Sequence, residues 1–145
     1  MRDIRCQAVI LKRDRVLVAR QYNSRRNEEY WMLPGGNVEN GETPENAIKR
    51  ELREETNLEV HIKAILFDEI GNRGDSYNRY ITYLCFPKLG SELKVGSETT
   101  TFRTILDLVW CSVTNEDSYN EYVLKEQFYP SMKEIKNKLI KFGEL

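Results

Sequence analysis

The stretch of sequence that decides the fold is GNVENGETPENAIKRELREETNL, residues 36–58. The Thr-Pro-Glu tripeptide at 43–45 is typical of a helix start, because Thr caps, Pro suits the first helical position and Glu complements the helix dipole. An apolar stripe follows, and we expect the helix to run to about Thr56. Asn57 tolerates the left-handed conformation of a helix C-cap, so the pattern predicts where the helix ends.

Three acidic residues of this helix, Glu51, Glu54 and Glu55, are spaced so that they share one helical face. Such a cluster is in most proteins a solvated face. Here Arg50 can reach Glu54 one turn on, but a single guanidinium does not neutralise three acids. A divalent cation does, and carboxylate oxygens are the ligands that Mg²⁺ prefers. The residues alone thus leave two interpretations open, a metal site and a solvated face.

The whole stretch resembles the Nudix box. The pattern is a glycine, five residues, Glu42, seven residues, RELxEE at 50–55, one residue, a usual glycine and an aliphatic residue. Asn57 stands where the family usually has glycine, and the left-handed cap explains the exchange. The resemblance implies one Nudix hydrolase domain over residues 1–145, of the α/β (α+β) class, folded as an α/β/α sandwich with a mixed β-sheet.

The resemblance also implies which residues hold the metal. Glu51, Glu54, Glu55 and the carbonyl of Gly35 correspond to family ligands for Mg²⁺ or Mn²⁺. Such a metal neutralises charge on a pyrophosphate and lowers the pKa of a bound water.

Three further roles follow from the same correspondence. Arg50 orients a carboxylate by ion pairing, while Gly36 and Glu42 are structural in the motif. Glu51 and Glu54 are both candidates for the general base that takes the proton of the attacking water. Glu98, in the polar loop 96–103, corresponds to a place where many relatives supply a further acid, and a solvated loop residue is the alternative.

The function implied is metal-dependent hydrolysis of a pyrophosphate bond in a nucleoside diphosphate derivative, such as a nucleoside triphosphate, sugar nucleotide or dinucleoside polyphosphate. The expected partner is a small-molecule nucleotide, and a homodimer would be ordinary for the family. Two alternatives stay open. One is a nucleotide-binding sensor without turnover, and the other is an RNA 5′-end pyrophosphohydrolase.

Composition narrows these classes. The net charge is -1 and the pI about 6.0, which argues against a broad basic surface for nucleic acid. No segment has the length and apolarity of a signal peptide or a membrane span, so we expect a cytoplasmic protein. The three cysteines lack metal-ligand spacing and are expected to be buried free thiols.

Outside the box, alternating apolar residues predict a first strand from Ile4 to Ile10 with one polar face, and a hairpin to a second strand at 16–19. Residues 23–29 are predicted to form a loop, and Gly35-Gly36 a turn. Further elements are predicted as strands at Leu58–Phe67, Arg79–Phe86 and Leu106–Val113, and as an amphipathic helix at Pro130–Lys141.

Candidate substrate contacts lie outside the box as well. Arg20, Arg25 and Arg79 are candidates for phosphate contacts, with surface charge as the default interpretation. Tyr77 could stack on a base, although covering the sheet edge is at least as good an explanation. His61, the only histidine, is interpreted as an exposed or hydrogen-bonded strand residue.

Overall fold

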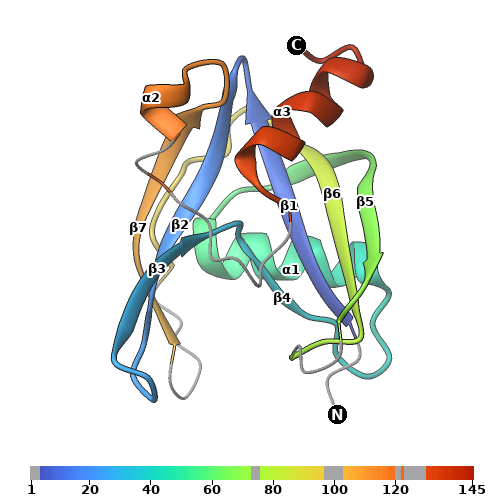
Figure 1. Ribbon diagram of the computed structural model, residues 1–145. Helices are drawn as coiled ribbons and strands as arrows, with labels where there is room; N and C mark the ends of the chain where they lie inside the picture. Colours follow the sequence, from blue (N-terminus) through green and yellow to red (C-terminus); the bar gives the residue numbers. More distant parts are fainter. Residues whose placement is uncertain (1–3, 73–75, 97–102, 120–121, 123–129) are drawn as a thin grey trace.

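The described part of the chain contains seven strands and three helices (Figure 1). The computed structural model describes residues 4–72, 76–96, 103–119, 122 and 130–145. The strands are β1 (Ile4–Lys12), β2 (Arg15–Asn23), β3 (Glu28–Met32), β4 (Gly35–Asn37), β5 (Val60–Ile70), β6 (Arg79–Pro87) and β7 (Arg103–Ser112). The helices are α1 (Pro44–Thr56), α2 (Glu116–Tyr119) and α3 (Met132–Lys141).

The sheet is mixed, as predicted. Its order is β3-β2-β1-β6-β5, with β4 paired to β1 and β7 paired to β2. The β1–β6 pair is parallel, and the other pairs are antiparallel. β1 and β2 pair only beside their hairpin, at Leu11↔Val16 and Lys12↔Arg15. Away from the hairpin the two strands diverge, and β4 takes the place beside β1 (Figure 1).

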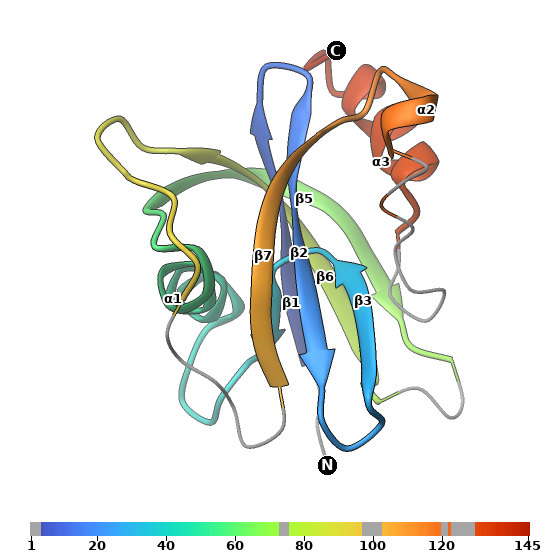
Figure 2. The same ribbon diagram turned by 90° about the vertical axis from the view of Figure 1, so that its left-hand side faces the viewer.

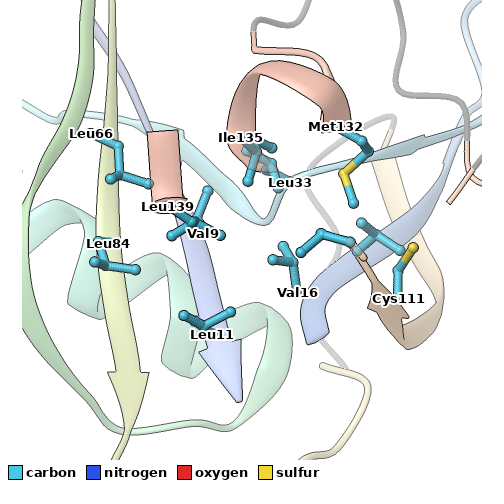
Figure 3. Packing of buried hydrophobic residues seen from close by; sticks show 12 residues of the cluster. Val9, Leu11, Val16, Leu33, Leu66, Leu84, Cys111, Met132, Ile135 and Leu139 are labelled. Atoms are coloured by element: carbon cyan, nitrogen blue, oxygen red, sulfur yellow. The ribbon is translucent and has the colours of Figure 1, made fainter. Parts of the chain in front are cut away.

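Helices cover opposite faces of the sheet (Figure 2). Alternate residues of β1 point to the two sides. Ala8 and Ile10 pack in the cluster that contains Ile48 and Leu52 of α1. Val9 and Leu11 belong to the cluster on the other face, whose members Ile135 and Leu139 come from α3 (Figure 3). The predicted α/β/α sandwich is confirmed.

The first strand differs from its prediction in one respect. Its polar residues Arg5 and Gln7 were expected on a solvated face, but each is only 1% exposed. The alternation of side chains between two faces was predicted correctly. The exposure of the polar face was predicted wrongly, because the face that carries Val9 and Leu11 is covered as completely as the other. Whether a second layer covers a strand is decided by tertiary packing, which alternation alone does not reveal.

Two short segments also differ. The predicted loop at 23–29 is a tight hairpin, since β2 continues to Asn23, which pairs with Glu28 of β3. The predicted turn at Gly35-Gly36 is the strand β4, which lies antiparallel to β1. The other strands agree with the prediction to within about three residues, and α3 begins after Pro130 because Ser131 caps it.

The structure also tests the predictions for the three cysteines, for membrane-spanning helices and for His61. Cys6, Cys85 and Cys111 are buried thiols outside any disulfide, as expected. In the part of the chain that is described, no helix is long and apolar enough to cross a bilayer. His61 lies on β5 with an exposed side chain, which agrees with its interpretation as an ordinary strand residue.

Candidate active site

Helix α1 begins and ends where its sequence predicts. The Thr43 hydroxyl accepts a hydrogen bond from the backbone N–H of Asn46, and Pro44 occupies the first turn. Asn57 adopts φ 63°, the left-handed region, and its N–H donates to the Arg53 carbonyl. The Asn57 side chain also donates to the carbonyl of Glu92 at 2.8 Å. These caps fix both ends of the helix, and therefore fix where along the helix axis each acidic residue lies.

Arg50 is the centre of the acidic cluster. Its guanidinium forms a bidentate pair with Glu42, at 2.7 and 2.9 Å. It also donates to Glu51 at 3.0 Å and Glu54 at 3.2 Å, and to the Asn37 carbonyl at 3.1 Å. The predicted ion pairing is thus present, and one guanidinium joins the box loop, β4 and two acids of α1. These anions raise the pKa of Arg50, with the Glu42 bonds as the main cause.

Glu51 lies against β4. A β-carbon built on Gly36 would stand 2.5 Å from the Glu51 carboxyl carbon, so only glycine leaves room for this approach. The Glu51 side chain is 16% exposed, against 35% for Glu54. Burial raises the pKa of Glu51, and the Arg50 charge opposes that rise. A nearby positive charge therefore stabilises the ionised form of Glu51 against the effect of burial.

Glu55 lies on the same side of the helix and reaches the start of β4. Its carboxylate accepts a hydrogen bond from the Gly35 N–H at 3.0 Å. Burial, followed by the nearby charge of Glu51, raises the pKa of Glu55 well above its ordinary value. The Gly35 peptide, predicted as a metal ligand through its carbonyl, is thus directly tied to one of the predicted acidic ligands.

The chemistry of these donors fits a divalent cation. Within the described residues no three acidic side chains converge as a preformed metal cage; Arg50 holds Glu51 and Glu54 instead. Yet Glu51 and Glu55 are two mutually repelling carboxylates in a poorly solvated place, and a hard cation removes both the repulsion and the cost of desolvation. Glu51, Glu54, Glu55 and the Gly35 carbonyl are the groups that would hold Mg²⁺ or Mn²⁺.

The predicted substrate contacts are dispersed. Arg20 lies 3.8 Å from Glu29 and 5.9 Å from the Trp31 ring centroid. Arg79 forms a bidentate pair with Asp68, at 2.6 and 2.8 Å. Both arginines are thus paired with acids outside the box.

Arg25 and Glu98 add little to the site as described. The Arg25 backbone N–H donates to the Asn23 side chain in the β2–β3 turn, and Arg25 is exposed. Glu98 lies outside the described residues, so its predicted role stays a prediction.

Tyr77 lies in a different place from the one a base-stacking role requires. Tyr77 is 2% exposed, and its ring packs edge-on against that of Tyr80, with the centroids 5.6 Å apart. Its hydroxyl donates to the Asn37 side chain at 2.5 Å. Asn37 in turn accepts from Arg50 through its carbonyl. Tyr77 therefore supports the box from within, and stacking on a base would require it to leave this packing.

Sequence reasoning missed three residues beside the site. Asn37 accepts from both Tyr77 and Arg50. The Cys6 thiol donates to the Gly36 carbonyl at 3.4 Å, and burial raises its pKa to about 12, so it stays protonated. Arg5 pairs with Asn37 of β4 across the sheet, and its side chain donates to the Leu33 carbonyl. The only sequence signal was a charged residue inside a strand pattern, which is equally typical of a solvated face.

Comparison with curated proteins gives partial matches. An 8-oxo-dGTP diphosphatase from Proteus vulgaris is 35% identical over 75 residues, which cover 52% of this chain and 64% of that protein. An ADP-ribose pyrophosphatase from Methanocaldococcus jannaschii is 33% identical over 91 residues, covering 62% of this chain and 53% of that protein. The matches thus span between about half and two thirds of these relatives.

The fold and the family are matched over nearly the whole chain. A crystal structure of an ADP-ribose pyrophosphatase from Streptococcus suis superposes with a TM-score of 0.70, covering 98% of this chain and 92% of that one. At 16% identity this likeness concerns the fold alone. A family model described as the NUDIX domain matches residues 1–135. This match, together with the geometry of the box described above, shows that the chain belongs to the NUDIX domain family.

Proposed function

We propose that this protein hydrolyses a pyrophosphate bond in a nucleoside diphosphate derivative, with Mg²⁺ or Mn²⁺ as cofactor. The observation that carries the proposal is the arrangement around Arg50, which holds two acids of α1 while a third acid binds the Gly35 N–H. A structural helix face does not need buried, mutually repelling carboxylates, because each of them reduces stability unless a cation compensates.

The roles that we propose for the acidic residues follow from how exposed each carboxylate is. Glu51 and Glu55 are acids whose pKa is raised by burial, and they are the proposed anchors of the metal. When bound, Mg²⁺ or Mn²⁺ neutralises charge on the phosphates and acidifies water. Glu54 has the most open carboxylate of the Arg50-bound pair, at 35% exposure, and is our choice for the general base. Arg50 orients Glu54 for that proton transfer.

The substrate class rests on the diphosphate linkage. The two curated relatives are named for 8-oxo-dGTP and for ADP-ribose, which differ in base and in the group beyond the phosphates. What these substrates share is a nucleoside joined to a phosphoanhydride. We therefore propose this linkage as the recognised feature, with a small nucleotide rather than a nucleic acid as partner.

A panel assay tests the proposal. The full chain is incubated with nucleoside triphosphates, 8-oxo-dGTP, ADP-ribose, sugar nucleotides and dinucleoside polyphosphates, with Mg²⁺ or Mn²⁺, and products are separated by chromatography. We expect cleavage of at least one compound, and loss of about 10²-fold or more in kcat for Glu54→Gln. Glu59→Gln is the matched control, because Glu59 is an exposed acid paired with Arg53 just beyond the helix.

Two outcomes overturn the proposal. One is a folded protein that cleaves nothing in the panel with either metal. The other is full activity in Glu54→Gln, which would remove Glu54 from the reaction. Tight nucleotide binding by calorimetry without turnover would instead identify a nucleotide sensor.

A further inference from the structure

Arg5 is a buried charge that the proposed reaction does not use directly. It lies on β1 and is 1% exposed. Its Nη2 donates to the Leu33 carbonyl at 3.1 Å, and its Nε to the Gln7 side chain at 3.3 Å. Gln7 continues the network by donating to the Thr82 hydroxyl on β6 at 3.0 Å. Arg5 thus joins the central strands of the sheet to the segment that leads into β4.

The burial of the Arg5 guanidinium is energetically unfavourable. Burying a charge costs more than packing an apolar side chain of similar volume, unless anions repay that cost. Two of its acceptors are neutral oxygens, those of the Gln7 side chain and the Leu33 backbone. A charged donor forms a stronger hydrogen bond than a neutral one, so Arg5 holds the Leu33 carbonyl in place.

The hydrogen bond to Leu33 has a second consequence. Leu33 is followed by Pro34 and then by Gly35, whose N–H holds the Glu55 carboxylate. The Pro34 carbonyl accepts a hydrogen bond from the Ala8 N–H at 3.0 Å. Two residues of β1 therefore bind two successive carbonyls of this segment, Ala8 through its backbone and Arg5 through its side chain. The position of the Gly35 peptide, and through it of Glu55, depends on both bonds.

We propose that Arg5 is a positioning residue for the divalent metal: it fixes the segment at 33–35 and, through the Gly35 N–H, the Glu55 carboxylate, and so sets metal affinity. The inference rests on the proposed function, because it takes the acidic cluster to be the metal site. Arg5 acts through Gly35 and Glu55 and has no assigned contact with the substrate.

The test separates the charge of Arg5 from its fork of donors. Arg5→Lys keeps the charge and loses the planar fork, whereas Arg5→Met loses both. Mn²⁺ binding to the full chain is measured by electron paramagnetic resonance without nucleotide, and melting temperatures are recorded in parallel. We expect Mn²⁺ affinity to fall about tenfold or more in Arg5→Met and by a smaller factor in Arg5→Lys. Arg53→Met, an exposed arginine of α1 paired with Glu59, is the matched control and should bind as the wild type.

The outcomes are distinct. Folded Arg5 variants that bind Mn²⁺ within twofold of the wild type would overturn the inference and leave Arg5 a purely structural residue. If Arg5→Met does not fold, Arg5→Lys decides the question by the same measurement. Wild-type protein that binds Mn²⁺ but cleaves nothing in the panel would contradict the proposed function alone. Wild-type protein that binds no Mn²⁺ would contradict both.

Discussion

The carboxylate of Glu51 lies directly against the α-carbon of Gly36. A β-carbon at Gly36 would be 2.5 Å from the Glu51 carboxyl carbon and from one of its oxygens. Gly35, its neighbour, is enclosed on the other side, where a β-carbon would lie 2.6 Å from the Gln7 α-carbon of β1. The two glycines therefore permit two different close approaches, one to a flexible side chain and one to a backbone.

Substitution of these two glycines should have different effects. In Gly36→Ala the end of the Glu51 side chain has to move, so Mn²⁺ affinity should fall about tenfold while the free energy of unfolding changes by about 1 kcal/mol or less. In Gly35→Ala the new methyl meets the backbone of β1, and the loss of stability should be about 2–3 kcal/mol. Urea unfolding and Mn²⁺ titration measure the two quantities. Equal loss of stability in both variants would contradict the assignment.

Arg50 should not tolerate replacement by lysine. Arg50→Lys keeps the positive charge but cannot form the bidentate pair with Glu42 while also holding Glu51 and Glu54. We expect a loss of about 2 kcal/mol in the free energy of unfolding. We also expect a fall of about 10²-fold in kcat/KM, because the acids lose their orientation. Arg53→Lys on the same helix is the control, and an Arg50→Lys variant with full activity would show that charge alone suffices.

The sequence predicted the helix and its acids because their determinants are local. Capping by Thr43, the left-handed Asn57 and the spacing of Glu51, Glu54 and Glu55 depend on neighbours within a few residues. The strand at Gly35–Asn37 was not predicted, since glycine has little intrinsic strand preference and only pairing with β1 makes it a strand. The burial of Arg5 and Tyr77 likewise depends on segments remote in the chain, which no local pattern encodes.

Asn57 offers a test of the departure from the family pattern. Its φ of 63° favours glycine, but its side chain also donates to the Glu92 carbonyl. Asn57→Gly should therefore be close to neutral, because relief of the backbone offsets the lost hydrogen bond. Asn57→Ala loses the bond and keeps the strain, so it should cost about 1–2 kcal/mol. The comparison is made by thermal unfolding, and a fully stable Asn57→Ala would contradict this account of the cap.

Tyr77→Phe distinguishes support of the box from contact with a base. The variant keeps the buried ring and removes only the hydroxyl that donates to Asn37. If Tyr77 supports the box, the free energy of unfolding should fall by about 1–2 kcal/mol and kcat should fall, because Asn37 also accepts from Arg50. If Tyr77 instead contacts the substrate, KM should rise with unchanged stability. Urea unfolding together with steady-state kinetics separates the two.

Asp14, in the β1–β2 turn, gives a prediction on pH that is independent of the proposed metal site. Its carboxylate accepts from the hydroxyls of Thr114 at 2.7 Å and Ser112 at 2.8 Å, which ties the turn to the end of β7. These bonds, that from Thr114 first, lower the pKa of Asp14 below its ordinary 3.8. A group with a lowered pKa in the folded state stabilises the protein above its unfolded pKa, and this stabilisation is lost as the pH falls through the folded pKa.

Asp14→Asn should therefore reduce the free energy of unfolding at pH 7 by about 1 kcal/mol or less, since solvent screens a turn carboxylate. The difference from the wild type should shrink as the pH falls below 3.8, where the wild-type carboxylate also takes up its proton. Urea unfolding of both proteins at pH 7, 5 and 3 measures it. A difference that stays constant over this range would mean that the Asp14 hydrogen bonds do not depend on its charge.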